Sequence, residues 1–270
     1  MSNQQIIDNL ESVWRSVDGL CTTFAEREWK TPTDCPGWSV QDQVSHMIGI
    51  ESQLLARPEP NHTPRDLSHV RNEQGKRNEV AIDWRRNWAG ARVLEEFRQV
   101  TGERLRVLRA MTAEDFSAEC QTPIGPGTVR DLLGIRLFDC CVHEQDIRRA
   151  VGRPGHLEGP AAEDSIERVS NVMPYVIGRK VGAPDGTTVV FDVTGPTGRI
   201  LSIGVEGGRA RLTDAPPTSP DLRLTMDSET FACLGCGRWE PGGLIASGRV
   251  RFEGDRQLGE AIVAQMNFLI

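Results

Sequence analysis

The residues between 138 and 146 include the side chains best suited to bind a metal ion. If this stretch is helical, Asp139 and His143 are one turn apart and project from the same face. A metal site needs at least one more protein ligand. The best distant candidate is His46, which lies on another run with helical spacing. The sequence therefore predicts that the first half of the chain brings His46 to Asp139 and His143.

Two histidines and one carboxylate form a donor set for Zn²⁺ or another first-row divalent ion, with positions left open for water or substrate. The alternative is that His46 and His143 are ordinary core or surface histidines, because an acid and a histidine four residues apart are common on helices. The position of His46 favours the metal site, since this residue interrupts an apolar helical run where an unpaired polar group is costly to bury. An open coordination position would make the site catalytic in character.

Two further acids of the same stretch are expected to surround the ion. With 3.6 residues per turn, Asp146 lies near the face of Asp139 and His143, whereas Glu144 points roughly 100° away from His143. Asp146 is therefore a spare ligand or an acceptor for the second nitrogen of a ligating imidazole. Glu144 is a candidate general base if it borders the cavity.

The elements that position these residues are predicted from apolar residues spaced three and four apart. Ser39 and Thr128 are placed to cap two of the helices, and Asp42 completes a capping box with Ser39. The polar, proline-rich segment 57–79 is expected to be a long surface connection, with room for one short helix, that could cover a site. Four helices in the first half predict a four-helix bundle, which builds metal sites from side chains on facing helices. The helices are expected over residues 6–24, 40–55, 84–108 and 128–150.

The second half changes to a mixed pattern. After a helix over residues 160–179, β-branched runs are separated by glycine and proline turns, and two helices flank the last strand. The sequence therefore predicts a bundle domain over residues 1–155 and a smaller α+β domain over 156–270. The strands are expected at 187–193, 200–205, 222–226 and 250–252, and the later helices at 228–236 and 255–266.

Composition excludes several classes of function. The 270 residues are 38% hydrophobic and 26% charged, as in a globular protein, and the formal net charge of −7 leaves no basic excess for nucleic acid. No apolar run is long enough to span a membrane, and the first residues lack the features of a signal peptide. We therefore expect a cytoplasmic protein that binds neither nucleic acid nor membrane. No phosphate-cradling glycine motif indicates a nucleotide cofactor.

The remaining histidines, cysteines and tryptophans have simpler interpretations. Seven cysteines, mostly in apolar runs, indicate reduced thiols in place of a disulfide framework. The pair Cys233 and Cys236 lacks a second ligand pair for a zinc ribbon, and Cys140 and Cys141 are expected to pack in the core. Histidines in polar loops are expected to be solvated, and most tryptophans to fill the bundle core. These residues are His62, His69 and His156, and Trp14, Trp29, Trp38, Trp84 and Trp88.

Two motifs carry a resemblance to a known family. The run Thr31-Pro32-Thr33-Asp34-Cys35-Pro36-Gly37-Trp38-Ser39-Val40 leads into the helix of His46, and Asp139 to Ala150 holds the other candidate ligands. Together they resemble the mycothiol-dependent maleylpyruvate isomerase family, whose N-terminal half is a DinB-like metal-binding four-helix bundle. The resemblance implies that His46, Asp139 and His143 hold the metal. Asp139 stands where the isomerase itself uses a glutamate.

The resemblance extends to the second domain. Residues 230–238 and 250–255 are similar to the family's C-terminal domain, which has a sterol-carrier-like fold. It implies that Arg238 holds a substrate carboxylate, for which a planar guanidinium is suited. The alternative is that Arg238 caps the preceding helix or pairs with a surface acid.

The resemblance implies a metal-dependent enzyme of thiol chemistry. Zinc at His46, Asp139 and His143 would bind a low-molecular-weight thiol, mycothiol in the family, and lower its pKa so that a thiolate attacks a small electrophile. The outcome would be isomerisation or S-transfer. Two alternatives use the same residues: a small-molecule-binding protein with a structural metal, and a metal-assisted hydrolase of thiol conjugates.

Overall fold

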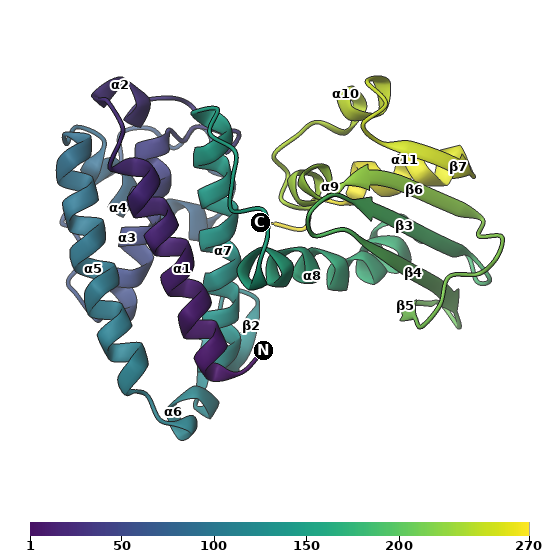
Figure 1. Cartoon of the computed structure of the whole chain (residues 1–270), viewed down its shortest axis with the longest axis horizontal. Helices are drawn as coiled ribbons and strands as arrows, with labels where there is room; N and C mark the ends of the chain where they lie inside the picture. The colour runs from purple at the N-terminus through teal and green to yellow at the C-terminus, as the bar shows by residue number, and fades with distance from the viewer. Residues whose placement is uncertain (270) are drawn as a thin grey trace. The chain divides into compact units, whose positions relative to one another are not determined.

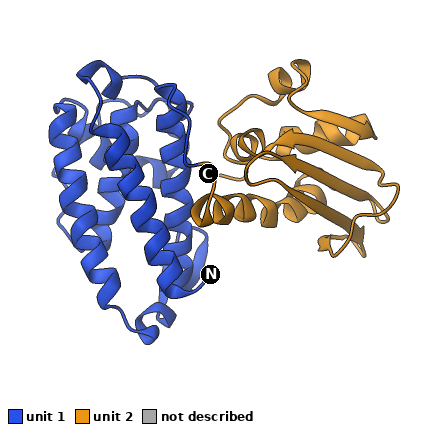
Figure 2. Cartoon of the chain, viewed as in Figure 1, with its two compact units in different colours: residues 1–156 blue, residues 157–270 orange. Residues whose placement is uncertain are grey.

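A computed structural model describes residues 1–269 and divides the chain into two compact units, Met1–His156 and Leu157–Ile270 (Figure 2). The first unit is mainly helical, and the second combines helices with a five-stranded sheet. The prediction of a helical N-terminal part followed by an α+β part is confirmed. Its finer description as a DinB-like four-helix bundle with a sterol-carrier-like partner stays a prediction.

Four long helices form the frame of the first unit (Figure 1). Each of α1 and α3 packs against both α5 and α7. Helix α1 shows why these segments are helical, because its apolar residues fall on one face and are buried. The four helices are α1 (Asn3–Cys21), α3 (Val40–Leu54), α5 (Gly90–Ala110) and α7 (Val129–Ala150).

Capping boxes fix where α3 and α7, the helices of the candidate ligands, begin. The Ser39 side chain accepts from the Asp42 backbone N–H, and Asp42 accepts from the Ser39 backbone N–H at 2.8 Å. Thr128 and Asp131 do the same at the start of α7. Each box satisfies backbone donors that a helix N-terminus leaves open. The predicted caps at Ser39 and Thr128 are therefore confirmed.

The predicted helix over residues 84–108 is wrong at its beginning. Helix α4 (Glu73–Arg85) occupies part of the segment expected to be a connection, and α5 starts only at Gly90. Trp84 lies one residue before the end of α4 and 42% of its surface is exposed, so it is not a core residue although its spacing is helical. The first unit also contains α2 (Glu26–Trp29), α6 (Ala113–Ser117) and a hairpin of β1 (Glu119–Thr122) and β2 (Gly125–Thr128), none of which was predicted.

The second unit is built around a mixed sheet with strand order β5-β4-β3-β6-β7. Its central strand β3 pairs antiparallel with β4 and parallel with β6. Val189, Phe191 and Val193 of β3 are buried, and Phe191 meets Phe231 of α9 at 5.7 Å between ring centroids. Because alternate side chains of a strand point to the same face of a sheet, these three residues share the face that α9 covers. The strands are β3 (Thr188–Thr194), β4 (Arg199–Glu206), β5 (Arg209–Thr213), β6 (Leu222–Asp227) and β7 (Arg251–Gly254).

Helices follow and separate these strands. The helix predicted over residues 160–179 continues to Val181, but its last turn is a wider π-helical segment, η1 (Val176–Val181). Strand β5 and helix α10 were not predicted, whereas the strands near 187, 200, 222 and 250 were. The helices are α8 (Pro160–Tyr175), α9 (Ser228–Gly235), α10 (Pro241–Ala246) and α11 (Arg256–Gln265).

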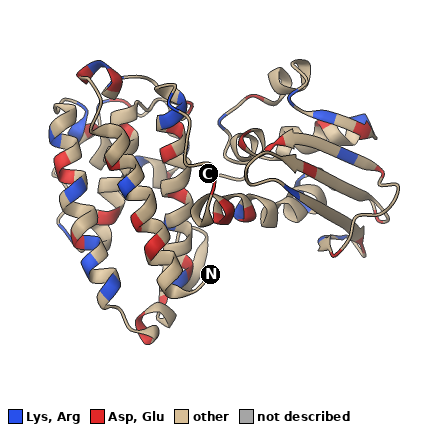
Figure 3. Ribbon diagram, in the orientation of Figure 1, with Lys and Arg blue, Asp and Glu red and all other residues tan. Residues whose placement is uncertain are grey.

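Charged residues of both signs occur on most of the long helices of the first unit. Acidic and basic residues both lie along α1, α4, α5 and α7, whereas α3 carries only the acids Asp42 and Glu51 (Figure 3). Among residues 1–269, no helix combines the length and apolar character that crossing a membrane requires.

Candidate metal centre

His46 of α3 and the pair Asp139 and His143 of α7 converge in the first unit. His46 Nε2 lies 3.2 Å from Asp139 Oδ2, and His143 Nε2 lies 3.4 Å from Asp139 Oδ1. One donor atom from each residue can be chosen so that all three lie within 4.8 Å of one another. The two imidazole centroids are 4.8 Å apart. Three donors that meet in this way can be ligands of a single ion.

The protonation states of two of the three groups suit metal binding. Burial lowers the pKa of His46 to about 4, which keeps its imidazole neutral and able to donate a lone pair. Burial alone would raise the pKa of Asp139, but the charges of Arg136 and His143 hold it well below its usual range. Burial also opposes protonation of His143, yet Asp139 and Asp146 raise its pKa. The donor set therefore contains a neutral histidine and an ionised carboxylate, and an ion bound to His143 would displace the proton that the two neighbouring acids favour.

Trp38 forms a wall of this cluster. Its ring centroid is 5.1 Å from that of His46 and 5.6 Å from that of His143. Trp38 is partly exposed and does not lie in the bundle core, so the prediction that it fills the core is wrong. One sequence signal could have placed Trp38 near the helix of His46. Trp38 directly precedes the Ser39 cap, and an apolar residue in that position often packs against the first turn of the helix that follows.

A chain of buried charges ends at Asp139. Arg136 Nη1 lies 2.5 Å from Asp139 Oδ2, and Arg136 Nε lies 2.9 Å from Glu51 Oε1. The other Glu51 oxygen is 3.2 Å from Arg104 Nε. Glu51, Arg104 and Arg136 are all buried. Sequence reasoning missed them, although Arg136 stands one helical turn before Asp139 on an otherwise apolar face.

The structure separates the two acids that were expected beside the ion. Asp146 Oδ2 lies 3.4 Å from His143 Nδ1, and its other oxygen pairs with Arg149 at 2.5 Å. Asp146 is therefore placed where an acceptor for His143 is needed. Glu144 instead contacts Ser16 at 2.6 Å, Arg148 and His156. It is 1% exposed and turned toward α1, as the 100° step from His143 requires, so a role as general base stays a prediction.

The three loop histidines contradict the expectation that they are solvated. His62 Nε2 lies 2.6 Å from Asp83, and His69 Nε2 lies 2.8 Å from Glu79. His156 Nδ1 lies 2.7 Å from Glu144. In each pair the acid is almost fully buried, so the imidazole supplies a partner that the carboxylate could not obtain from water.

The cysteines lie outside the cluster. Cys140 and Cys141 are buried as predicted, and the Trp14 indole approaches the Cys140 sulfur at 3.4 Å. Burial raises the pKa of Cys140 to about 12, so its thiol stays protonated at neutral pH. Cys233 and Cys236 are buried. Neither pair joins the group of potential ligands found among residues 1–269.

Arg238 belongs to the second unit, three residues after the end of α9. It is half-buried, and its Nη1 donates to the backbone oxygen of Cys236 at 3.0 Å. Its own backbone N–H donates to Cys233 O at 2.8 Å. The capping interpretation therefore describes one of its bonds, and a role in binding substrate stays a prediction.

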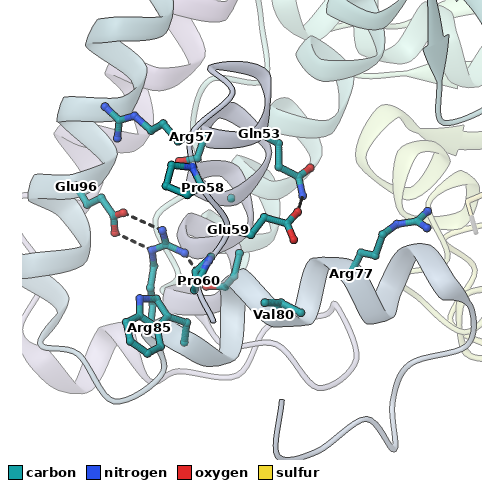
Figure 4. A pocket seen from close by; sticks show the side chains of 13 residues that line it. Gln53, Arg57, Pro58, Glu59, Pro60, Arg77, Val80, Arg85 and Glu96 are labelled. Atoms are coloured by element: carbon teal, nitrogen blue, oxygen red, sulfur yellow. Dashed lines mark hydrogen bonds and ion pairs between the residues drawn. The ribbon is translucent and has the colours of Figure 1, made fainter. Parts of the chain in front are cut away.

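A separate cleft of about 320 Å³ lies among α3, α4 and α5 (Figure 4). Its walls include polar side chains that are already paired, such as Arg85 with Glu96 and Gln53 with Glu59. It contains none of the three clustered residues His46, Asp139 and His143. The cleft is thus not a part of the candidate metal centre.

Comparison with known proteins identifies the family. Residues 10–148 match the model of the mycothiol maleylpyruvate isomerase N-terminal domain, and residues 163–261 match that of the MDMPI C-terminal domain. No significant match is found among curated proteins.

Solved structures share the fold. A crystal structure of the mycothiol-dependent maleylpyruvate isomerase is 12% identical, with a TM-score of 0.56 and coverage of 88% of this chain and 90% of that chain. A histidine-to-alanine mutant of that isomerase is 13% identical, with the same score and coverage. Sterol carrier protein 2 from Yarrowia lipolytica, at 17% identity, covers 39% of this chain and 93% of its own with a TM-score of 0.28, too low to support a fold assignment. The two family models span both units, and the chain therefore belongs to the mycothiol-dependent maleylpyruvate isomerase family.

Proposed function

We propose that this protein is a metal-dependent enzyme that uses a low-molecular-weight thiol, mycothiol, as the nucleophile in the isomerisation of a small electrophile such as maleylpyruvate. The observation that carries the proposal is the convergence of His46, Asp139 and His143 within 4.8 Å, in a chain that belongs to this family. The partners of the enzyme are then two small molecules, the thiol and the electrophile.

His46, Asp139 and His143 would hold the ion, and zinc suits their nitrogen and oxygen donors. A bound divalent cation lowers the pKa of a coordinated thiol, so that a thiolate is available at neutral pH. A structural zinc site normally has four protein ligands, whereas the cluster found among residues 1–269 has three. This difference supports a site that leaves room for the thiol.

The reaction needs a nucleophile that adds and then leaves. The thiolate forms a C–S bond to one carbon of the cis double bond, and the π electrons move onto the conjugated carbonyl as an enolate. Rotation about the resulting single bond follows. The enolate then re-forms the double bond in the trans geometry, the C–S bond breaks, and the thiolate returns unchanged. Trp38 and the buried side chains around the cluster would limit access of water to the thiolate.

S-transfer is the second candidate outcome. It uses the same C–S bond formation, but a proton is added to the enolate carbon and the thioether is released. The identity of Asp139 supports S-transfer as a second candidate, because its side chain is one methylene shorter than the glutamate that the resemblance gives for the isomerase. A shorter arm would shift the ion and therefore the geometry of elimination.

Arg238 is proposed to hold an anionic group of the thiol or the substrate. Its guanidinium presents a planar fork that matches a carboxylate. Replacing it by methionine should raise KM for an anionic substrate more than it lowers kcat. Lysine should restore part of the lost affinity, because it keeps the charge without the fork.

The test combines metal analysis with an assay. Purified protein should contain one divalent ion per chain and should convert maleylpyruvate in the presence of mycothiol. His46→Ala should lose both the ion and the activity. His62→Gln is the matched control, since His62 pairs with Asp83 and lies outside the cluster, so it should keep both. The proposal fails if the protein binds no ion and if His46→Ala retains wild-type activity. Release of a thioether in place of the trans isomer would identify S-transfer.

A further inference from the structure

Arg136 is the residue that the proposed chemistry leaves unexplained. Its side chain is 5% exposed, yet it is not buried against apolar neighbours alone. It reaches Asp139 with Nη1, Glu51 with Nε and the Cys140 sulfur with Nη2, at 2.5, 2.9 and 3.5 Å. Burying a guanidinium is costly unless an anion compensates its charge, because the ion loses its hydration. A hydrophobic side chain would fill this position with a smaller desolvation penalty, which suggests that the charge of Arg136 has a function.

The charge chain extends over three helices and ends at the cluster. Arg104 of α5 pairs with Glu51 of α3, Glu51 pairs with Arg136 of α7, and Arg136 pairs with Asp139. The chain contains two arginines and two acids, so its formal charges cancel. The negative charge of Asp139 is therefore balanced before any cation arrives.

The pairing also distinguishes the two oxygens of Asp139. Oδ2 accepts from Arg136 and also lies 3.2 Å from His46 Nε2, whereas Oδ1 has His143 Nε2 as its neighbour at 3.4 Å. The guanidinium charge of Arg136 therefore lies one hydrogen bond away from the carboxylate that would ligate the ion.

We propose that Arg136 sets the charge of the metal centre: its guanidinium neutralises Asp139, so that the loaded centre keeps excess positive charge for an anionic ligand. The inference rests on the proposed metal centre. In this inference, Glu51 holds the Arg136 guanidinium in place through an ion pair, and Arg104 holds Glu51 in the same way. The inference also predicts that Arg136 weakens the binding of the metal while strengthening the binding of the thiolate, because its charge repels the cation and attracts the anion.

The test measures metal affinity, and it does so in the absence of substrate. In a chelator competition with zinc, Arg136→Met should bind the ion more tightly than wild type, by roughly tenfold, since a nearby positive charge is lost. Arg136→Lys should stay within about threefold of wild type, because the charge is retained. For the zinc-loaded proteins, the Kd of mycothiol should rise in Arg136→Met.

A matched control lies on the same helix. Arg130 stands nine residues before Asp139, which is about 13 Å along a helix, and it bonds Asn3 and the Met1 backbone instead of the cluster. Arg130→Met makes the same change in charge and side chain, and it should leave both the zinc and the mycothiol affinity unchanged. An equal effect of the two variants would overturn the inference.

Other outcomes are equally decisive. Zinc affinity that is unchanged or weaker in a folded Arg136→Met would reject the role of Arg136 while leaving the metal centre intact. If Arg136→Met does not fold, the neutral and polar Arg136→Gln decides in the same competition: tighter zinc binding supports the inference, and unchanged or weaker binding overturns it. Wild-type protein that binds no zinc at all would instead reject the proposed function.

Discussion

The indole N–H of Trp38 donates to a carboxylate oxygen of Glu79 at 2.7 Å, so a residue that lies against both clustered histidines is tied to helix α4. Glu79 is 1% exposed and also contacts His69 and Arg86. His69 comes from the segment between α3 and α4, and its ring packs so closely on Gly37 that a Cβ at Gly37 would be 2.4 Å away. One buried carboxylate therefore joins this segment, the turn before α3 and helix α4.

Trp38→Phe should destabilise the protein by about 2 kcal/mol, because a hydrogen bond to a buried charged acceptor is lost. The measurement is the free energy of unfolding from urea denaturation. Trp84→Phe is the control, since Trp84 is 42% exposed and should change stability by no more than about 0.5 kcal/mol. Equal losses in the two variants would show that the bond to Glu79 contributes nothing specific.

The pair of His156 and Glu144 should make stability depend on pH. The hydrogen bond from His156 to Glu144 raises the pKa of the imidazole in the folded protein above its ordinary value, although burial acts in the opposite direction. The pair of protonated His156 and Glu144 therefore contributes its full stabilisation below about pH 6.5, the ordinary pKa of histidine. That contribution is lost as the pH rises through the folded-state pKa.

His156→Asn tests this dependence, because asparagine tolerates the positive φ of 54° at this position but carries no charge. The difference in unfolding free energy between wild type and variant should be largest near about pH 5.5 and should shrink toward about pH 9. A difference that stays constant, or that grows with pH, would contradict the assigned pairing.

Two glycines of α5 should respond oppositely to alanine. A Cβ at Gly90 would lie 2.2 Å from the buried Trp29 ring, whereas one at Gly102 would meet nothing within 4 Å. Gly90→Ala should therefore destabilise the protein by about 1 to 3 kcal/mol through overpacking. Gly102→Ala should stabilise it by roughly 0.5 to 1 kcal/mol, because the residue is exposed within a helix. Thermal denaturation of both variants measures whether each substitution lowers or raises the stability. A Gly90→Ala variant as stable as wild type would refute the close contact with Trp29.

Zinc should raise the thermal stability of the wild-type protein. An ion that binds only the folded state contributes about 2.7 kcal/mol when its concentration is a hundred times Kd. His143→Gln should abolish most of this increase, since it removes one of three proposed ligands. Removal of zinc with a chelator should reverse it in wild type. A variant that responds to zinc as wild type does would exclude His143 as a ligand.

Local sequence signals identified much of the helical frame. The apolar spacing of α1, the capping box at Ser39 and the cap at Thr128 act within one or two helical turns, so the sequence alone can indicate them. The same signals failed where a side chain depends on distant neighbours. Trp84 has the spacing of a core residue but is exposed, and His62 lies in a polar segment but meets the buried Asp83.

The candidate centre shows the same division. Spacing on one helix placed Asp139 and His143 on a common face, and resemblance added His46; the structure brings these three together, while their role as metal ligands stays a prediction. Spacing correctly turned Glu144 away from His143, but only the packing of α1 showed what it meets there. The family is therefore readable from motifs within single segments. The environment of the cluster, formed by Trp38, Arg136 and Glu51, depends on how α3, α5 and α7 pack, because ion pairs between helices leave no periodic pattern in the sequence of either helix.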